Sequence, residues 1–250
     1  MTKINFPKIG NKEHLSHMFS AQQWIGKSCK IPPNVLFIYS AGFHNLLIHL
    51  FEFRKNLELC DKDMWKRKTM ITADNKLFVI EDAIGAPSTA AAMEKAIVCG
   101  GKNFLILGRA GGLGSDVRLN DIVLCSKAIR DEGTSHHYIN SSKYVMPTKS
   151  LTSELAKKML ENGIKFSKGP TWTTDAIFAE TKKEVRKYSD EGVLTVDMEA
   201  AAMFAVAKKR NVNASAAFVV SDILNKDMVK GAESYEELAR IAEIFKNNFG

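Results

Sequence analysis

The stretch that decides the fold is FLILGRAGGL, residues 104–113. Its first four residues, Phe104–Leu107, are apolar, and a glycine-rich segment follows them directly. A continuous apolar run of this length predicts a strand buried on both faces, as in a mostly parallel sheet covered by helices. Glycines after such a strand let the backbone approach an anion or a sugar, but they are equally typical of a tight turn. The G-x-G-x-x-G spacing of a dinucleotide-binding loop is absent.

Similar apolar runs alternate with helical periodicity along the whole chain. This order predicts an α/β protein, a three-layer α/β/α sandwich with a mixed, largely parallel central sheet. Because no repeat or flexible linker interrupts it, we expect residues 1–250 to form a single domain, with residues 1–30 as a divergent N-terminal extension. The expected strands are Val35–Tyr39, Leu77–Ile80, Phe104–Leu107, Asp121–Cys125, Val193–Val196 and Ala216–Val220, and the expected helices are Thr89–Val98, Leu151–Asn162, Glu199–Arg210 and Tyr235–Phe249.

Composition excludes several classes of protein. Hydrophobic residues make up 45% and charged residues 25%, which are globular values. No apolar run reaches the ~18–20 residues of a membrane span, and residues 1–14 contain no signal-peptide core. The net charge is +7, but the basic residues are dispersed, so we expect no nucleic-acid partner. Cys29, Cys60, Cys99 and Cys125 contain no C-x-x-C pair, which predicts neither a zinc site nor a disulfide framework, and favours a reduced, cytoplasmic protein.

Acidic residues follow two of the expected strands. Asp197 and Glu199 flank Met198 where a strand meets a helix. A carboxylate there can accept hydrogen bonds from the vicinal hydroxyls of a ribose, although helix capping is the favoured interpretation of this segment taken alone. Asp222 follows an apolar strand, where burial can raise the pKa of a carboxyl toward general-acid use, or where it can cap the next segment.

A dense polar segment, residues 128–138, ends in the vicinal histidines His136 and His137. Adjacent histidines suggest a metal site, but no acidic or histidine partner lies at ligand spacing. We therefore expect a hydrogen-bonded loop there, and no bound metal.

Six segments, taken in order, resemble nucleoside phosphorylase family I, which includes uridine phosphorylases, hexameric purine nucleoside phosphorylases and methylthioadenosine nucleosidases. The likeness runs from about Leu77 to Asp222. It implies an α/β fold, a homo-oligomer (hexamer or dimer), and phosphorolysis of a purine nucleoside or uridine to free base and ribose 1-phosphate. Phosphate is then a co-substrate, with no cofactor. The segments are GAPS (85–88), GRAGGL (108–113), AIRDEGTS (128–135), TTDA (173–176), VDMEA (196–200) and VSD (220–222).

The resemblance also implies roles for individual residues. Met198 and Glu199 match the ribose-binding pair, and Asp222 matches the acid that protonates a leaving purine. Ile177 stands where the family usually has an aromatic residue under the base, and Phe178 beside it could compensate. Two further residues of the matching segments complete the expected substrate site: Asp197 and Thr174.

The phosphate-binding residues depart from the family pattern. Residues 40–44 read SAGFH where the family has Gly-Asp-Pro-x-Arg, so His44 replaces one phosphate arginine. Ile106 occupies the position of a second, whereas Arg109 stands where the family has Ser or Thr. The expected phosphate set is therefore Arg109, Gly108, Ser40 and His44.

Two further family features are weak or missing. Only His14 and His17 could match the N-terminal histidine that some members lend to a neighbouring subunit, and no Gln-x-Arg uracil reader follows Phe178. The sequence leaves open purine against uridine. It also leaves open a nucleosidase that uses water, and a nucleoside-binding protein without turnover.

Overall fold

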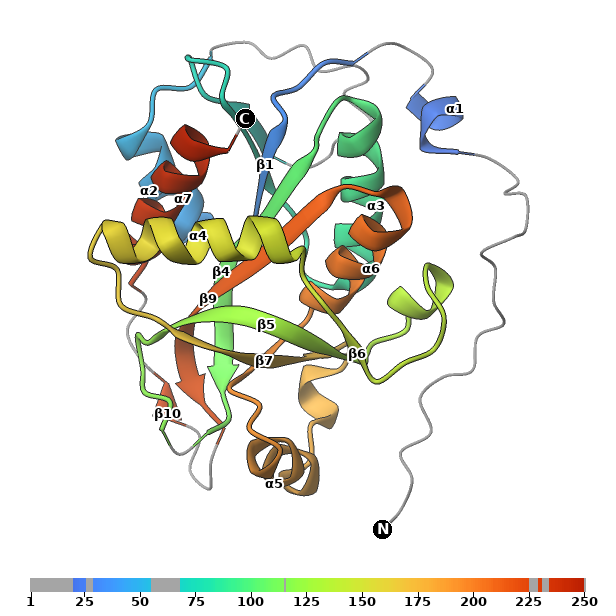
Figure 1. Cartoon of the computed structure of the whole chain (residues 1–250), viewed down its shortest axis with the longest axis vertical. Helices are drawn as coiled ribbons and strands as arrows, with labels where there is room; N and C mark the ends of the chain where they lie inside the picture. Colours follow the sequence, from blue (N-terminus) through green and yellow to red (C-terminus); the bar gives the residue numbers. More distant parts are fainter. Residues whose placement is uncertain are drawn as a thin grey trace.

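A mixed ten-stranded sheet forms the centre of the protein, with helices packed on both of its faces (Figure 1). The computed structural model describes residues 20–25, 29–54, 68–114, 116–224, 229–230 and 234–249. This architecture confirms the expected α/β fold class. No helix in these ranges is long and apolar enough to cross a membrane.

The strands and helices occur in an irregular alternation. The strands are β1 (Asn34–Ile38), β2 (Lys68–Ile71), β3 (Leu77–Glu81), β4 (Asn103–Gly112), β5 (Ile122–Asp131), β6 (Tyr144–Val145), β7 (Ser167–Thr174), β8 (Thr195–Asp197), β9 (Asn213–Ile223) and β10 (Val229–Lys230). The helices are α1 (Ala21–Ile25), α2 (Ala41–Leu50), α3 (Ala86–Val98), α4 (Lys149–Glu161), α5 (Lys182–Asp190), α6 (Ala200–Arg210) and α7 (Glu236–Asn248), with short 3₁₀ turns η1 (Ser135–His137) and η2 (Ile177–Ala179).

Part of the sheet closes on itself. The strand order is β10-β9-β5-β7-β8-β4-β1-β3-β2, and β9 also pairs with β4. Strands β4, β9, β5, β7 and β8 therefore form a ring, and β1, β3 and β2 continue from β4 as an open sheet. The pairings β1–β3, β1–β4, β4–β9, β5–β7 and β7–β8 are parallel, whereas antiparallel pairs lie at the sheet edges and at two junctions of the ring.

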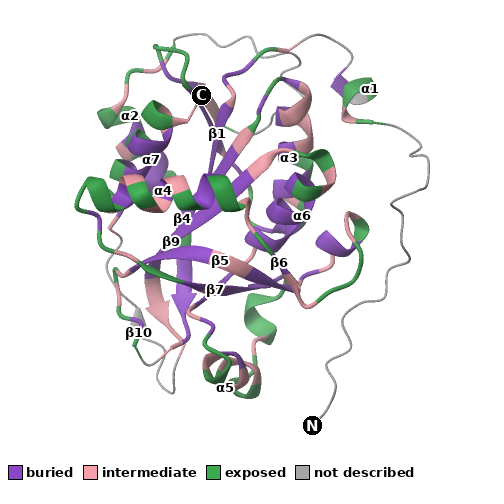
Figure 2. Cartoon of the chain, in the orientation of Figure 1, coloured by how far each residue is buried: buried purple, intermediate pink, exposed green. Residues whose placement is uncertain are grey.

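Two main hydrophobic layers follow from the alternation of side chains along the strands. In β1, Val35 and Phe37 face the layer that contains α3 and α6, whereas Leu36 and Ile38 face the layer that contains α4 and α7. Both faces of the strand are therefore buried, as the continuous apolar run predicts (Figure 2). Alanines at 200–202 let α6 pack closely against the sheet.

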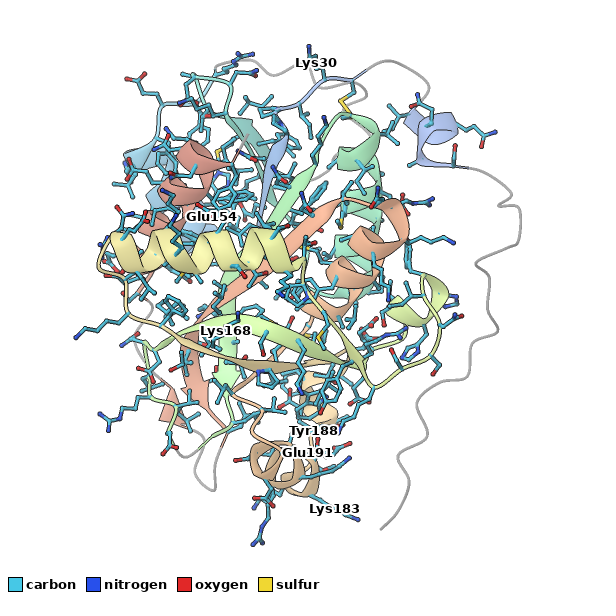
Figure 3. All side chains as sticks on the ribbon, viewed as in Figure 1. Lys30, Glu154, Lys168, Lys183, Tyr188 and Glu191 are labelled. Carbon is cyan, nitrogen blue, oxygen red and sulfur yellow. A yellow bond between two sulfur atoms is a disulfide. The ribbon has the colours of Figure 1, made fainter. Side chains whose placement is uncertain are left out.

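A smaller cluster lies at the end of the molecule that carries α5. The rings of Trp172 on β7 and Tyr188 on α5 have centroids 4.9 Å apart, and both side chains are buried. Glu191, which follows α5, forms an ion pair with Lys143 (Figure 3 shows Tyr188 and Glu191). A capping box between Thr181 and Glu184 begins α5.

Every expected strand and helix is present, with ends that differ by a few residues from the predicted ones, except that β4, β5 and β9 are longer. The glycine-rich segment, residues 108–112, is the final part of β4 and not a turn. It pairs with β9 and, at its end, with β8. Glycine permits this because strands from both sides approach it closely.

The expectation of four reduced cysteines is wrong for one pair, because Cys29 and Cys99 form a disulfide. Cys99 ends α3, and the backbone N–H of Ile31 donates to the Cys99 carbonyl at 2.9 Å. Residues 29–31 therefore lie beside the end of α3, although 70 positions separate the two cysteines. The spacing of cysteines in the sequence does not reveal such a contact. Cys125 is free and buried. Cys60, His14, His17 and most of the expected N-terminal extension lie outside the described residues.

Reduction of this disulfide should destabilise the protein. The bond closes a loop of 70 residues, which restricts the unfolded chain, so its loss should lower the free energy of unfolding by about 2–4 kcal/mol. Denaturant titrations with and without a thiol reductant measure the effect, and a Cys29→Ser variant should not respond to the reductant. Identical curves for the wild-type protein under both conditions would contradict the prediction.

Candidate active site

A cavity of about 710 Å³ opens where several strands end. Such a position is typical of ligand sites in α/β proteins. Residues after β1, β3 and β7, the ends of β4 and β9, and the junction of β8 with α6 form its walls. Of the expected site residues, nine line it: Asp222, Met198, Glu199, Asp197, Ile177, Phe178, Arg109, Gly108 and Ser40.

Asp197 holds the junction of β8 and α6 together. Its Oδ1 accepts hydrogen bonds from the hydroxyls of Thr171 (3.0 Å) and Thr173 (2.8 Å) on β7. Its Oδ2 accepts from the backbone N–H groups of Glu199 (2.8 Å) and Ala200 (2.6 Å) at the start of α6. The carboxylate is 5% exposed, and burial raises its pKa while the four donors oppose that shift. The capping interpretation is thus correct for Asp197.

Glu199 is placed differently, although it follows only two residues later. Its Oε1 accepts from the backbone N–H of Gly85 at 2.8 Å, which links the start of α6 to the start of α3. Gly85 has φ 115°, a conformation that glycine adopts readily. Burial, together with the charge of Asp197, raises the pKa of Glu199 to about 8. Glu199 is the N-cap residue of α6, but its side chain makes no capping hydrogen bond; its Oε2 accepts from the Met198 N–H at 3.3 Å, and the carboxylate has remaining acceptor capacity beside the cavity.

A bulge aims Asp222 into the cavity. Strands β4 and β9 pair in regular register up to Ala110 with Val220, but the next pair is Gly111 with Asp222. Ser221 is the extra residue, and such a bulge changes the face toward which the following side chain points. The Ser221 hydroxyl donates to Asp222 Oδ1 at 2.7 Å.

Gly111 makes room for this arrangement. A Cβ there would lie 2.9 Å from Val196 Cγ1 and 3.2 Å from Asp222 Oδ2, and would also meet Leu224. A side chain at this position would therefore displace Asp222 or the wall of the cavity.

The loop after β7 forms the apolar side of the cavity. Ile177 and Phe178 are 54% and 101% exposed, so they offer apolar surface that nothing in the described chain covers. Asp175 anchors the loop, because its Oδ2 accepts from the Gly133 N–H at 2.8 Å. Thr174 does not line the cavity; its hydroxyl accepts from Ala176 N at 3.3 Å and shapes the same loop.

Sequence reasoning missed Glu180, a half-buried residue of the cavity wall. Burial and the charges of Asp222 and Glu184 raise the pKa of Glu180 to about 7. Its position two residues after Phe178 was the available signal.

The expected phosphate residues separate into two groups. Gly108, Arg109 and Ser40 line the cavity, and Ser40 is the N-cap of α2. The Arg109 side chain is exposed. His44 lies outside the cavity lining: its Nδ1 is 2.7 Å from Glu81 Oε2, and burial lowers the pKa of the imidazole.

The polar segment, residues 128–138, is only partly the expected loop: residues 128–131 belong to β5, and residues 132–138 form a loop after it that contains η1. Arg130 is fully buried and donates to the hydroxyls of Ser135 (2.9 Å) and Ser142 (2.8 Å), and to the carbonyls of Ile139 and Asn140. His136 Nε2 donates to the Arg130 carbonyl at 3.1 Å. In the described ranges, no three His, Cys, Asp or Glu side chains gather as a metal site would require.

Comparison with known sequences identifies the family. The model of the Phosphorylase superfamily matches residues 58–249. The chain belongs to this superfamily. A guanosine phosphorylase from Halorubrum lacusprofundi is 32% identical over 167 residues, which are 67% of this chain and 69% of that protein. A DeoD-type purine nucleoside phosphorylase from Exiguobacterium sibiricum is 32% identical over 152 residues, which are 60% of this chain and 64% of that protein.

Solved structures support the superfamily fold. An AMP nucleosidase from Bacteroides thetaiotaomicron superposes with a TM-score of 0.72 at 18% identity, covering 95% of this chain and 97% of that one. A uridine phosphorylase from Vibrio fischeri superposes with a TM-score of 0.68 at 20% identity, covering 87% of each chain. At these identities the likeness concerns the fold alone.

The two acids of the β8–α6 junction should affect stability in opposite directions. The Glu199 carboxyl ionises near pH 4.5 when unfolded and near pH 8 when folded, so its charge destabilises the folded protein progressively as the pH rises between these values. Glu199→Gln should therefore raise the melting temperature at pH 8.5, with a gain that shrinks toward pH 5. Asp197→Asn should lower the free energy of unfolding by about 2 kcal/mol, because the amide NH2 that replaces one carboxylate oxygen cannot accept the hydrogen bonds that this oxygen receives.

Thermal melts of both variants at the two pH values provide the measurement. A Glu199→Gln protein that is less stable than the wild type at pH 8.5 would contradict the assignment of a charge penalty to this residue.

Proposed function

We propose that this protein is a nucleoside phosphorylase that acts on purine nucleosides. Inorganic phosphate attacks C1′ of the ribose, the N-glycosidic bond breaks, and the products are the free base and ribose 1-phosphate. The observation that carries the proposal is that one cavity holds a buried acceptor for the sugar, Glu199, an acid for the base, Asp222, and a cation, Arg109. The names of the relatives, guanosine phosphorylase and purine nucleoside phosphorylase, agree with it.

Glu199 is suited to hold the ribose. Its carboxylate can accept from both vicinal hydroxyls, which fixes the sugar while C1′ acquires oxocarbenium character. Hydroxyl donors favour the ionised carboxylate, and they compensate for the burial that raises the pKa of Glu199 in the empty site. Met198 packs beside the same pocket.

Asp222 is suited to assist departure of the base. A purine leaves more easily when N7 receives a proton, and a carboxylic acid at the cavity wall can supply it. Ser221, which donates to Asp222 Oδ1, fixes the orientation of this carboxyl group. A uracil lacks N7, so this geometry favours purines over uridine.

Arg109 is suited to bind phosphate. Its guanidinium can grip an oxyanion with two hydrogen bonds, and the N-terminus of α2, capped by Ser40, opens on the same cavity. This set replaces the arginines that the related enzymes carry at the positions of His44 and Ile106.

One observation favours hydrolysis instead. His44 is directed to Glu81, and Ile106 is fully buried in the core, so neither can take over the role of a phosphate arginine. A nucleosidase, in which water attacks C1′, is therefore the second candidate. A binding protein without turnover is the third, and the presence of both Glu199 and Asp222 speaks against it.

Phosphate dependence separates these candidates. We expect base release from inosine or guanosine only when phosphate is present, and Arg109→Ser should raise the KM for phosphate roughly 10- to 150-fold, with a smaller effect on the KM for the nucleoside. Arg118→Ser, which changes an exposed arginine outside the cavity lining, is the matched control. Equal base release without phosphate would refute phosphorolysis in favour of hydrolysis.

Variants of Glu199 and Asp222 test the separate roles proposed for them, binding of the ribose and protonation of the base. Glu199→Ala should reduce kcat/KM for every nucleoside, whereas Asp222→Asn should reduce it for inosine much more than for uridine, because only the purine needs the proton at N7. Steady-state assays on both nucleosides measure this contrast. Equal losses on inosine and uridine in the Asp222 variant would contradict its role.

Further parts of the proposal rest on the sequence rather than on the cavity. We place the protein in nucleoside salvage in the cytoplasm, as a homo-oligomer. We also infer that the reaction needs no metal or organic cofactor, because phosphate is the co-substrate and the acids above supply the remaining chemistry.

A further inference from the structure

The proposed function does not use Glu180, although this residue lies in the same cavity as Asp222. It directly follows the 3₁₀ turn η2, whose Ile177 and Phe178 form the apolar wall. The loop is anchored at its other end by Asp175 on Gly133. Glu180 therefore lies on a positioned segment beside the place where a base would pack.

No structural role accounts for the Glu180 carboxyl group. Thr181, the next residue, forms the capping box of α5 with Glu184, so the Glu180 side chain takes no part in it. Among the described residues, no hydrogen bond or ion pair involves the side chain of Glu180. The Glu180 carboxyl group is half-buried in the wall of a cavity and has no partner among the described residues, so a ligand that donates hydrogen bonds could pair with it.

The surroundings of Glu180 make its placement unfavourable in the empty protein. Asp222 on β9 and Glu184 on α5 face it with like charge, and together with burial they raise its pKa to about 7. Arg109 lines the same cavity. A ligand that donates hydrogen bonds to Glu180 would relieve this cost.

The chemistry of purines identifies such a ligand. In a 6-oxopurine, N1 carries a hydrogen, and guanine adds a 2-amino group beside it, so two parallel donors are offered to one carboxylate. In adenine, N1 is an acceptor and repels a carboxylate. In the proposed function, Asp222 contacts the base at N7. Glu180, which is close enough for the charge of Asp222 to raise its pKa, can contact the six-membered ring of the same base.

We propose that Glu180 selects the base: its carboxylate accepts hydrogen bonds from N1–H and, in guanine, from the 2-amino group, so that guanosine and inosine are preferred over adenosine. This inference rests on the proposed function, in that the cavity is taken to bind purine nucleosides. Glu180 is then a specificity-determining residue that contacts the base, distinct from the acid that protonates it.

The test compares kcat/KM for guanosine, inosine and adenosine between the wild type and Glu180→Gln. Loss of a charged acceptor should lower kcat/KM roughly 10- to 100-fold for guanosine and less for inosine, and should leave that for adenosine unchanged or raised. Glu154→Gln, on α4 and outside the cavity lining, removes the same charge as the control (Figure 3). Equal losses on all three nucleosides, or no loss, would overturn the proposal.

A pH series adds a readout that a structural role would not move. Ionised Glu180 discriminates against adenosine, whereas its protonated form can donate to N1 of adenine. The guanosine-to-adenosine ratio of kcat/KM should therefore rise with pH through about 7 in the wild type and stay flat in Glu180→Gln. A ratio that rises equally in both proteins would count against Glu180.

Binding of free bases separates failure of this inference from failure of the proposed function. If the wild type releases no base from any nucleoside, the proposed function fails, but calorimetry with hypoxanthine and adenine still decides the role of Glu180. Hypoxanthine binding that weakens in Glu180→Gln, with adenine binding unchanged, supports selection by Glu180. Equal affinities in both proteins, or no binding of either base to the wild type, would overturn it.

Discussion

The hydrogen bonds of the Asp197 carboxylate are the constraint on which the candidate site depends. Threonines of β7 occupy one of its oxygens and the first N–H groups of α6 occupy the other, so one buried group joins two strands and a helix. Because Asp197 accepts the hydrogen bonds from the start of α6, the side chain of the next acid, Glu199, is not needed to cap this helix. Glu199 is consequently directed to Gly85 and the cavity, where the sugar is proposed to bind.

The acidic residues around the cavity destabilise the folded protein electrostatically, and the proposed function gives a reason for their presence. Burial raises the pKa of both Glu199 and Glu180, and in each case a neighbouring carboxylate adds to the shift. A structure selected for stability alone would place neutral side chains at these positions. In the proposed function, a bound nucleoside supplies further donors to these carboxylates, because its ribose hydroxyls and base N–H groups all donate hydrogen bonds.

Much of the fold could be predicted from the sequence, because buried parallel strands have a local signature that runs such as Phe104–Leu107 display. The ring of five strands could not, since the pairing of β4 with both β8 and β9 depends on contacts far apart in the chain. For the same reason, spacing alone did not reveal the Cys29–Cys99 disulfide. In the site, motif resemblance located Glu199 and Asp222 but missed Glu180, which lies outside the motifs. It also assigned phosphate binding to His44, which faces Glu81 instead.

The position of Arg109 gives the site a rigidity that a loop arginine would lack. Arg109 and Gly111 lie on the same strand, and β9 pairs with them through Val219 and Asp222. The cation proposed for phosphate and the acid proposed for the base are therefore held on two adjacent strands, and the bulge at Ser221 fixes their relative direction. A phosphate arginine on the loop after β1 would depend on the conformation of that loop. Strand pairing thus sets the separation between the proposed phosphate residue and the proposed acid for the base, and displacement at C1′ requires the two reacting groups to be held in a fixed relative position.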